Sequence, residues 1–463
     1  MIPVRGHDGC EVGILGLGST GTTTANALLL GGATPICWDD NNEVRERARD
    51  RGLLVSDLNQ DQILSKIKTL IVSPGIPHLY PAPHPIILKA MKLGVSLDND
   101  IGLFFRSLVT PSWESFEKRP KVICVTGSNG KSTTTAMIGH ILKENNIDVE
   151  LGGNFGNPAL SLSPGKSGDV KILEISSFQA ELAKFLQPDI SVFINLSLDH
   201  SERHAGKGGY FAAKSRLFTL SVPEKCIIGV DEDEGLFLTN MVKEKDFDPL
   251  IRFSTKGPVN GHGWKIFLKK GFLTEWREER QIASLDLRSL QNVSGRHNHQ
   301  NLCAAYGSAR ALGLAPKKIY QAVLSFPGLK HRSQIVAKKD NVTFVNDSKA
   351  TNFESAKSAL GSFENVRWIA GGQIKKGDKI SLSNFKDRVK FTYLIGSEAV
   401  EFSKFLPENS FVICESLDVA VKTAFEDSDS GDTVLLSPAC ASFDQFQNFE
   451  DRGNKFIEIV LNL

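Results

Sequence analysis

Short apolar runs alternate with amphipathic stretches along the whole chain. Apolar runs that predict buried strands lie at residues 12–17, 35–38, 122–125, 172–175, 191–196, 343–345, 368–370, 393–395 and 433–436, and residues 22–30 predict a helix. Strands that alternate with helices are typical of α/β architecture with mostly parallel sheets. A chain of 463 residues has room for about three such domains.

The sequence divides into three segments. Residues 107–121 are rich in proline, serine and charge, which predicts a linker. We therefore expect domains at residues 1–108, 109–327 and 328–463: a Rossmann-like domain, a central P-loop mononucleotide-binding domain with a mostly parallel sheet, and a Rossmann-like C-terminal α/β domain. Within the central domain, residues 243–290 alternate charged and aromatic positions, which predicts a small antiparallel sheet.

The composition argues against several classes of protein. Lysine plus arginine number 54 against 53 for aspartate plus glutamate, which disfavours a non-specific binder of nucleic acid or of a membrane surface. Seven cysteines occur without a CxxC pair, as expected for a reduced cytoplasmic protein. The N-terminal residues lack the apolar run of a signal peptide, and no stretch approaches transmembrane length.

The most informative stretch is residues 125–133, Val-Thr-Gly-Ser-Asn-Gly-Lys-Ser-Thr, which follows an apolar strand. In such a turn the backbone N–H groups surround phosphate oxygens, Lys131 adds a positive charge, and Ser132 or Thr133 can hold Mg²⁺. The loop is a variant, because Val125 stands where the standard pattern has glycine. The expected ligand is a nucleoside triphosphate, and the alternative is a glycine-rich turn capped by serine and threonine.

A second glycine turn, at residues 16–21, reads Gly-Leu-Gly-Ser-Thr-Gly and follows the first predicted strand. Asp39 and Asp40 follow at the end of the next strand, where an acid can bind a ribose hydroxyl. This pattern fits a nicotinamide dehydrogenase. It fits a nucleotide diphosphate sugar equally, since the geometry requires only a diphosphate and a sugar.

Eight stretches then occur in an order that resembles one family. They are residues 126–133, 152–156, 174–179, 199–200, 295–301, 331–332, 346–352 and 437–442. Together they resemble the Mur ligases of peptidoglycan synthesis. The last two stretches, with residues 443–449 and 452–454, are most similar to the members that add D-glutamate. The resemblance covers almost the whole chain, from residue 16 to residue 456.

The resemblance implies ATP-driven amide synthesis by a cytoplasmic monomer that acts on UDP-N-acetylmuramoyl-L-alanine and D-glutamate. The carboxylate of the UDP-linked substrate would attack the γ-phosphorus of ATP and become an acyl phosphate, and the amino group of D-glutamate would then displace phosphate. Because this chemistry brings anions together, it requires Mg²⁺, expected as two ions, and fixed cations. The C-terminal domain is expected to close on ATP and D-glutamate by a hinge at residues 326–330.

The resemblance also implies roles for individual residues. Catalytic roles are implied for Lys131, His200, Lys214, Arg332 and Lys349. ATP contacts are implied for Gly127, Ser128, Asn129, Gly130, Lys131, Ser132, Thr133, Asn298, Asn301, Arg332 and Asp347. Contacts to the UDP-linked substrate are implied for Ser19, Thr20, Asp39, Asp40, Ser73, Asn154 and His200. The D-glutamate pocket is implied at Thr351, Lys375, Ser442, Phe443 and Phe449, and metal ligands at Ser132, Thr133, Glu174, His200 and, if it is carbamylated, Lys214.

Two positions depart from the family's pattern. Asp40 stands where members often have a hydroxyl residue. Ile374 stands where they usually have an acid, so either Lys375 or Lys376 could contact D-glutamate.

Several of these residues also have a purely structural interpretation. The structural alternatives are a helix cap for Glu174, a solvated loop position for His200, an exposed helix position for Lys214 and a turn position for Ser73. Cys440 is interpreted as structural, since acyl-phosphate chemistry needs no thiol. The competing functions are another Mur-type or folylpolyglutamate-type ligase, a nicotinamide dehydrogenase, and a regulatory nucleotide-binding module without turnover.

Overall fold

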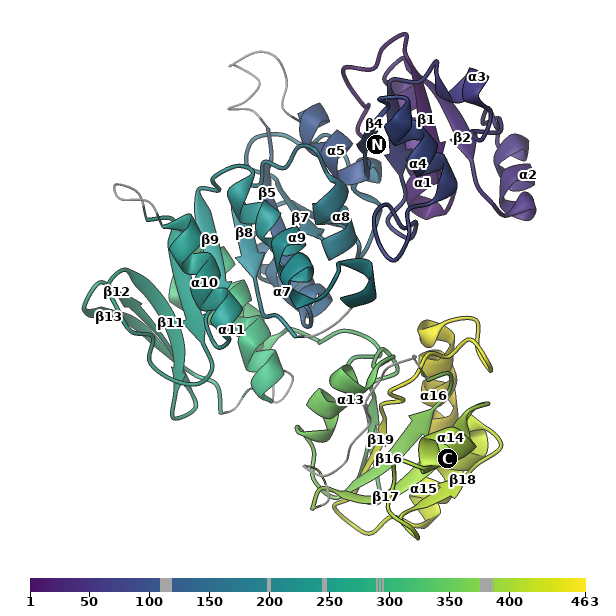
Figure 1. The fold of residues 1–463 in the computed structure, drawn as a ribbon. Coiled ribbons are helices and arrows are strands. Elements are labelled where there is room, and N and C mark those ends of the chain that lie inside the picture. The colour runs from purple at the N-terminus through teal and green to yellow at the C-terminus, as the bar shows by residue number, and fades with distance from the viewer. Residues whose placement is uncertain are drawn as a thin grey trace. The chain divides into compact units, whose positions relative to one another are not determined.

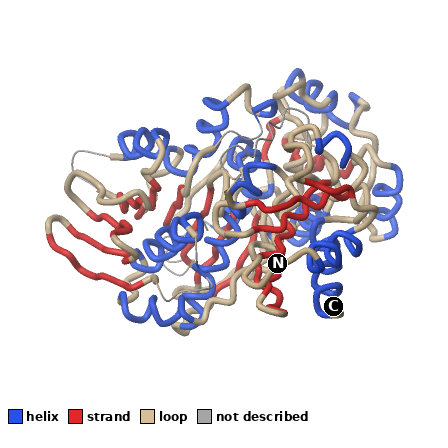
Figure 2. Tube along the Cα trace, turned by 90° about the horizontal axis from the view of Figure 1, so that it is seen from below, coloured by secondary structure: helices blue, strands red, loops and turns tan. Residues whose placement is uncertain are grey.

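Figure 1 shows a computed structural model of the chain. The structure describes residues 1–108, 119–197, 201–243, 248–288, 290, 293, 295–374, 385 and 387–463. It separates into two compact units: unit 1 comprises Met1–Gln291 and Asn298–Phe326, and unit 2 comprises Asn292–His297 and Pro327–Leu463. Helices surround the strands, as Figure 2 shows in blue and red.

The first sheet of unit 1 has the strand order β2-β1-β3-β4, and all of these neighbours are parallel. Its strands are β1 (Glu11–Leu15), β2 (Thr34–Trp38), β3 (Thr69–Val72) and β4 (Ser96–Asp98), and the helices of this segment are α1 (Ser19–Leu30), α2 (Asn42–Asp50), α3 (Asp61–Leu64), α4 (Pro85–Lys92) and α5 (Asp100–Leu108). Because β1, β2 and β3 are parallel, the segments that follow them lie together at the carboxyl ends of the strands.

The second sheet of unit 1 has the order β13-β12-β11-β10-β9-β8-β5-β7-β6. Its strands are β5 (Lys121–Thr126), β6 (Val149–Gly153), β7 (Val170–Glu174), β8 (Ile190–Phe193), β9 (Lys225–Gly229), β10 (Leu250–Ser254), β11 (Trp264–Lys269), β12 (Phe272–Arg277) and β13 (Arg280–Asp286). The helices are α7 (Lys131–Glu144), α8 (Ser177–Leu182), α9 (Lys207–Thr219), α10 (Asp233–Val242), α11 (Arg296–Ala311) and α12 (Pro316–Leu324), with 3₁₀ turns at Ala159–Ser161 and Ser201–Arg203. Pairing is parallel from β6 to β11 and antiparallel from β11 to β13.

Unit 2 contains one sheet of order β14-β15-β19-β16-β17-β18, in which only the β14–β15 pair is antiparallel among the described strands. The strands are β14 (Gln334–Lys339), β15 (Val342–Asn346), β16 (Val366–Gly371), β17 (Val389–Ile395), β18 (Phe411–Ile413) and β19 (Thr433–Leu436). The helices are α13 (Phe353–Leu360), α14 (Ala399–Ser403), α15 (Leu417–Glu426) and α16 (Phe449–Leu461). Apolar side chains cover both faces of the sheet, which accounts for two separate core clusters.

The strands expected from apolar runs are all present, with ends displaced by a few residues. The stretch at residues 243–290 differs from expectation. Its first strand, β10, pairs in parallel with both neighbours, and β11, β12 and β13 extend the edge of the same sheet instead of forming a small sheet of their own. The physical reason is burial, because Leu250, Ile251 and Phe253 of β10 are all covered, as in an interior parallel strand.

The division into three domains stays a prediction. Three separate sheets are present, but the first two belong to one compact unit. Of the expected linker at 107–121, residues 107 and 108 end α5 and residue 121 begins β5, while 109–118 lie outside the described residues.

Buried polar contacts join the first two sheets within unit 1. The Asn99 side chain donates to the carbonyl oxygen of Gln179 at 2.8 Å, and Asp98 accepts from the N–H of Lys184 at 3.0 Å. At the N-terminus, the N–H of Ile2 donates to Leu160 O at 2.8 Å. One apolar cluster runs from Ile2 to Leu250 across this junction. The first sheet is therefore packed directly against the segments that follow β7 of the second sheet.

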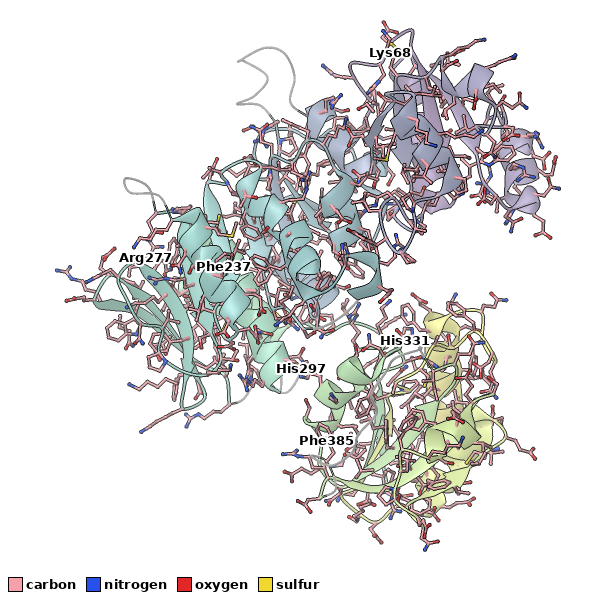
Figure 3. All side chains as sticks on the ribbon, in the orientation of Figure 1. Lys68, Phe237, Arg277, His297, His331 and Phe385 are labelled. Carbon is pink, nitrogen blue, oxygen red and sulfur yellow. The ribbon has the colours of Figure 1, made fainter. Side chains whose placement is uncertain are left out.

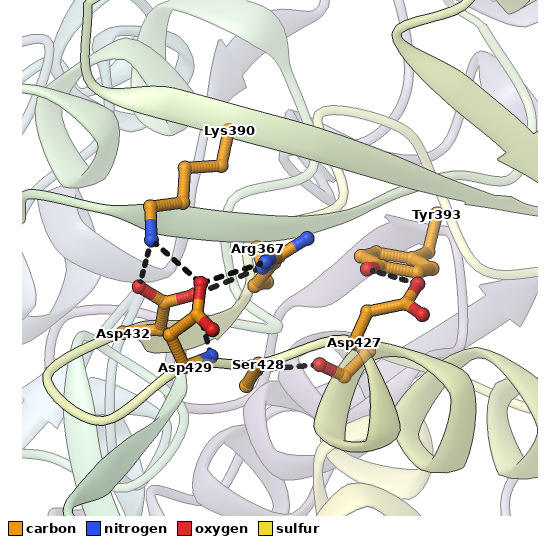
Figure 4. A network of polar contacts seen from close by, with 8 residues as sticks. Arg367, Lys390, Tyr393, Asp427, Ser428, Asp429 and Asp432 are labelled. Atoms are coloured by element: carbon orange, nitrogen blue, oxygen red, sulfur yellow. Dashed lines mark hydrogen bonds and ion pairs between the residues drawn. The ribbon is translucent and has the colours of Figure 1, made fainter.

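A charged network in unit 2 lies away from the predicted site residues (Figure 4). Asp432, only 1% exposed, accepts from Arg367 Nε at 3.0 Å and from Lys390 Nζ at 2.6 Å. Tyr393 donates to Asp427 at 2.8 Å beside them. Since Arg367 lies on β16, Lys390 on β17 and Asp432 directly before β19, the network ties three strands together near their amino ends. Among the described residues, no helix is both long and apolar enough to cross a membrane.

Candidate functional site

The segment between β5 and α7 forms a tight glycine loop. Gly127 has φ +154° and Gly130 has φ +81°, conformations that side chains disfavour. The Lys131 ammonium turns back over the loop and donates to Gly127 O at 3.0 Å and Ser128 O at 2.7 Å. The backbone and one cation thus converge on the space at the start of α7, which is the arrangement that binds phosphate.

The loop is held in place by the segment after the neighbouring strand β8. The N–H of Asn129 donates to Asn195 Oδ1 at 3.0 Å, and the N–H of Ser128 donates to Asn195 O at 3.0 Å. Ser128 Oγ donates to Ser197 O at 3.0 Å and accepts from its N–H at 2.9 Å. These contacts fix the loop without using the backbone donors nearest α7.

Glu174 lies at the carboxyl end of β7, next to β5, and is 2% exposed. Its Oε2 accepts from Ser132 Oγ at 2.5 Å and its Oε1 accepts from Asn154 Nδ2 at 3.0 Å. The cap of the following helix is Ser176, so the helix-cap alternative for Glu174 does not hold. Mg²⁺ is usually held by one or two carboxylates together with phosphate oxygens and water. A buried carboxylate that touches the phosphate-loop serine fits such an ion.

Lys214 lies on α9 and is 1% exposed, so the exposed-lysine alternative does not hold. Its ammonium donates to Gly127 O at 2.8 Å, the same carbonyl that accepts from Lys131. Two ammonium groups therefore meet at one carbonyl of the phosphate loop, where they favour bound anions.

Asn298 and Asn301 lie in the first turns of α11. Asn301 is 3% exposed, and its Oδ1 accepts from Thr134 Oγ1 at 3.3 Å. A Cβ at Gly130 would lie only 2.0 Å from this oxygen. The structure therefore places Asn301 against the phosphate loop, and Asn298 next to it, with Oδ1 3.5 Å from Asn301 Nδ2.

Of the seven residues predicted for the UDP-linked substrate, five follow strands of the first sheet: Ser19, Thr20, Asp39, Asp40 and Ser73. Asn154 follows β6 of the second sheet, and His200 lies outside the described residues. Ser19 and Thr20 open α1, whose N-terminus has no side-chain cap. Asp39 accepts from the N–H of Leu17 at 2.8 Å, so its carboxylate closes the glycine turn. Ser73 Oγ donates to the carbonyl oxygen of the turn's first glycine at 2.8 Å, which agrees with its structural interpretation. Asp40 is exposed and lies 2.9 Å from His84 Nε2.

In unit 2, Asp347 is buried at the end of β15. It accepts from the N–H of Ser333 at 3.0 Å and from Ser437 Oγ at 2.7 Å. Burial raises the pKa of Asp347 to about 7, although these hydrogen bonds and the positive charge of Arg332 act to lower it. The carboxyl group thus joins the ends of β15 and β19 beside Arg332.

Four of the five residues predicted for D-glutamate are described, namely Thr351, Ser442, Phe443 and Phe449, and the predicted catalytic residue Lys349 contacts one of them. The Lys349 ammonium lies 3.7 Å from the ring centroid of Phe449, the first residue of α16. Ser442 is 2% exposed, while Phe443 is 71% exposed. Thr351 lies half-buried directly before α13.

Some predicted residues lie outside the described residues. These are His200 with its neighbour Asp199, and both lysines considered for D-glutamate, Lys375 and Lys376. Thr133 is described and half-buried on α7. No group of three or more histidine, cysteine or acidic side chains could hold a metal within the part of the chain that the structure describes.

Sequence reasoning missed the residues that hold the loops. In unit 2, the buried Arg452 donates to Ser348 O at 2.9 Å and to Cys440 O at 3.2 Å, joining the loops of Lys349 and Ser442. The backbone oxygen of His331 (Figure 3) accepts a hydrogen bond from the backbone N–H of Lys349 at 3.0 Å. Asn195, which anchors the phosphate loop, had one usable signal: it is a polar residue inside the apolar run at residues 191–196.

Together, a glycine loop after a parallel strand, a converging lysine pair and a buried acid on the adjacent strand define a nucleotide-binding α/β protein. Residues 125–309 match the Mur ligase middle domain, and residues 331–440 match the Mur ligase glutamate ligase domain. The chain is 51% identical over 461 residues to the UDP-N-acetylmuramoylalanine–D-glutamate ligase of Cereibacter sphaeroides (strain ATCC 17025 / ATH 2.4.3), with 99% of each chain covered. It is 51% identical over 461 residues to the ligase of the same name from Ruegeria pomeroyi, again with 99% of each covered. The chain belongs to the Mur ligase family.

Solved structures agree with this fold. The UDP-N-acetylmuramate-alanine ligase MurC from Thermotoga maritima aligns with a TM-score of 0.58 and 18% identity, over 98% of this chain and 99% of that one. The MurF ligase from the same organism, solved in complex with ADP, aligns with a TM-score of 0.56 and 15% identity, over 99% and 97%. These neighbours support the fold, with mostly parallel α/β sheets and antiparallel parts.

Proposed function

We propose that this chain is an ATP-dependent ligase that joins D-glutamate to UDP-N-acetylmuramoyl-L-alanine, with ADP and phosphate as the other products, in the synthesis of peptidoglycan precursors. The observation that carries the proposal is the 51% identity, over 99% of both chains, to ligases of that name. A nicotinamide dehydrogenase would leave the Lys131 loop and unit 2 without a role.

The phosphate-loop geometry supports ATP as the energy source. In the proposed reaction, a carboxylate oxygen of the UDP-linked substrate attacks the γ-phosphorus and ADP leaves. The nitrogen of D-glutamate then attacks the acyl carbon, loses a proton, and phosphate leaves. The first step sets one anion against another. Lys131 is placed to offset that repulsion, and Lys214, which shares the Gly127 carbonyl with it, is the proposed position of a carbamate.

Magnesium fits the residues that are present. Ser132 and Glu174 would hold the ion, and the proposed second ion would involve His200 and a carbamylated Lys214. When bound, Mg²⁺ neutralises phosphate charge and polarises the γ-phosphoryl group. The chain's own contribution is to hold Glu174 in place, through Ser132 at 2.5 Å and Asn154 at 3.0 Å.

The remaining roles are part of the same proposal. Residues 1–108 would bind the UDP-linked substrate, residues 109–327 ATP, and residues 328–463 D-glutamate, in a cytoplasmic monomer. The glycine turn beside Asp39 supports the first assignment, because Asp39 closes a turn that leaves the N-terminus of α1 uncapped.

Phosphate release tests the proposal directly. The purified protein is mixed with ATP, Mg²⁺ and UDP-N-acetylmuramoyl-L-alanine, and each of a panel of D- and L-amino acids is added. We expect sustained phosphate release with D-glutamate and far less with L-glutamate. Equal rates with L-alanine or a diamino acid would point to another member of the family, and ATP binding without turnover would point to a regulatory module.

The proposed carbamate on Lys214 has its own test. In buffer depleted of carbon dioxide, activity should fall, and added bicarbonate should restore it, because a carbamate supplies an anionic oxygen where the lysine has a cation. A Lys214→Glu variant should not respond to bicarbonate. An unchanged rate in depleted buffer would rule the carbamate out.

A further inference from the structure

A column of stacked side chains connects the segment after β3 with the glycine loop after β5. It begins at Arg203, whose guanidinium donates to Gly75 O at 3.3 Å and lies 4.5 Å from the ring centroid of Phe178. Phe178 stacks on His204, with centroids 5.2 Å apart and planes 11° apart. His204 in turn lies 5.4 Å from the ring of Tyr210.

The far end of the column is Lys214. Its ammonium lies 4.4 Å from the ring centroid of Tyr210, on the same face of α9, since residues four apart on a helix are neighbours. The same ammonium donates to Gly127 O of the phosphate loop. The column therefore runs from the segment after β3, next to Ser73, to the triphosphate loop after β5.

Polar contacts hold the middle ring of the column in one orientation. His204 Nε2 lies 2.8 Å from Ser177 Oγ, and its Nδ1 lies 3.2 Å from Glu181 Oε2. The same carboxylate oxygen lies 3.3 Å from Nε2 of the buried His78, which follows β3. Nε2 is therefore held by a hydrogen bond, while Nδ1 lies near the carboxylate without a hydrogen bond among the described residues, so Ser177 and the two flanking rings set the plane of the imidazole.

A glycine in α9 lets the backbone carbonyl of His204 lie close to the helix. A Cβ at Gly209 would lie 1.8 Å from the carbonyl oxygen of His204, so only glycine allows His204 to approach the first turn of α9. At the other end of α9, Arg216 donates to Ala180 O of α8 at 2.8 Å and to Ala183 O, directly after α8, at 2.7 Å. The helix that carries Lys214 is thus fixed at both ends.

We infer that His204 and Tyr210 are positioning residues for Lys214: the ring column holds the Lys214 ammonium at the phosphate loop and ties it to the segment that follows β3. Lys214 lies on α9 and not on the phosphate loop or on α7, so residues outside the loop must hold its side chain at Gly127 O. The inference rests on the proposed function only for its effect on turnover, since the position of Lys214 can be measured without turnover.

The test is the chemical accessibility of Lys214. Native protein in carbon-dioxide-depleted buffer is treated with acetic anhydride, and acetylation of Lys214 is measured by peptide mass spectrometry against Lys143 of the same molecule. Tyr210→Leu removes the ring and keeps a bulky apolar side chain, and Tyr210→Phe keeps the ring. We expect acetylation of Lys214 to rise about 10-fold or more in Tyr210→Leu and in His204→Ala, and to stay near wild type in Tyr210→Phe.

The control is His7→Ala, which removes another buried histidine of unit 1 that does not touch the column. A rise in His7→Ala equal to that in His204→Ala would overturn the inference, because general loosening would then explain both. Acetylation of Lys214 at the wild-type level in a folded Tyr210→Leu variant would also overturn the inference. If Tyr210→Leu does not fold, Ser177→Ala keeps every ring and removes the hydrogen bond to the imidazole, and wild-type acetylation in that variant counts equally against the column.

Turnover gives the second measurement. In Tyr210→Leu, kcat should fall on the order of 10- to 100-fold while KM for the UDP-linked substrate changes little, because a misplaced Lys214 side chain affects the phosphoryl step. Tyr210→Phe should recover most of the loss. An inactive wild-type protein would overturn the proposed function, but it would leave the acetylation result intact.

Discussion

At the residue scale, the site is built from buried charged groups that each have a named partner. Glu174 holds Ser132 and Asn154, and Lys214 holds Gly127 O. Burying a charge is costly even when hydrogen bonds offset part of the cost. Buried charged groups that cluster in this way are therefore candidates for a functional role. Asp100 is different: it is 2% exposed, and neither carboxyl oxygen has a well-aligned hydrogen bond among the described residues, although backbone N–H groups and Gln179 lie close to it.

Asp100 gives a prediction for stability against pH. Burial raises the pKa of Asp100 to about 7, with weaker opposing effects from backbone N–H groups and from Gln179. The folded protein then binds its proton more tightly than the unfolded chain does, so stability falls as pH rises from the unfolded pKa toward 7 and levels off above it. Between pH 5 and pH 8 this amounts to about 3 kcal/mol, and Asp100→Asn should remove that loss.

Urea unfolding midpoints at pH 5 and pH 8 measure the effect. Asp61→Asn is the matched control: the Asp61 side chain is 75% exposed and the variant keeps Asp100, so it should retain the loss seen in wild type. If the change in stability from pH 5 to pH 8 is the same in wild type and in Asp100→Asn, Asp100 ionises in the folded protein without a free-energy cost.

At the scale of elements, the important feature is which loops meet at the carboxyl ends of neighbouring strands. In the second sheet, β7, β5 and β8 are adjacent, so Glu174, Gly127 and Asn195 come together there although the chain separates them. The first turns of α11 then cover the loop from the side of Gly130. The loop is rigid because two other elements hold it, and rigidity keeps its N–H groups aimed at a phosphate.

Gly130 gives a prediction at this scale. Gly130→Ala places a Cβ 2.0 Å from Asn301 Oδ1 and strains a backbone with φ +81°. ATP affinity, measured by calorimetry, should fall on the order of 10- to 100-fold because the loop must shift. Gly168→Ala is the control: its φ is +95°, but a Cβ there meets nothing within 4 Å. If both variants lose ATP equally, backbone strain and not the contact with α11 is the cause.

At the scale of the whole molecule, unit 1 carries two glycine loops on two different sheets. The loop after β1 and the loop after β5 each have their own strands, helix and anchoring side chains. The two proposed nucleotide sites should therefore respond separately to mutation. Unit 2 has its own sheet and its own gathering of Asp347, Lys349 and Ser442 at one edge.

Lys131→Ala tests this separation. Amide synthesis should be abolished, because the lysine reaches the loop that binds the triphosphate, while the affinity for the UDP-linked substrate stays within about 2-fold. Calorimetric titration with that substrate measures the second quantity. Lys143→Ala, in the last turn of the same helix, should leave both unchanged. If Lys131→Ala loses amide synthesis and affinity for the UDP-linked substrate to the same extent, the two sites are not separate.

The sequence by itself determined the elements and the chemistry of the loops. Apolar runs with glycine turns behind them predicted the strands, and the pattern at residues 125–133 predicted a phosphate loop before any fold was known. These signals are local, because backbone conformation and burial periodicity depend on residues that are near in sequence. For the run at 243–290, alternation correctly predicted antiparallel strands, which are β11, β12 and β13, but it did not show that β10 pairs in parallel or that all four strands belong to the larger sheet.

Only the tertiary structure decided which side chains meet. Nothing in the sequence shows that Asn301 presses on Gly130, that Lys214 and Lys131 share one carbonyl, or that His204 is held between Phe178 and Tyr210. The physical reason is that such contacts join residues far apart in the chain, and strand order and helix packing bring them together. A residue's type sets what it can bind, but packing sets what lies within its reach.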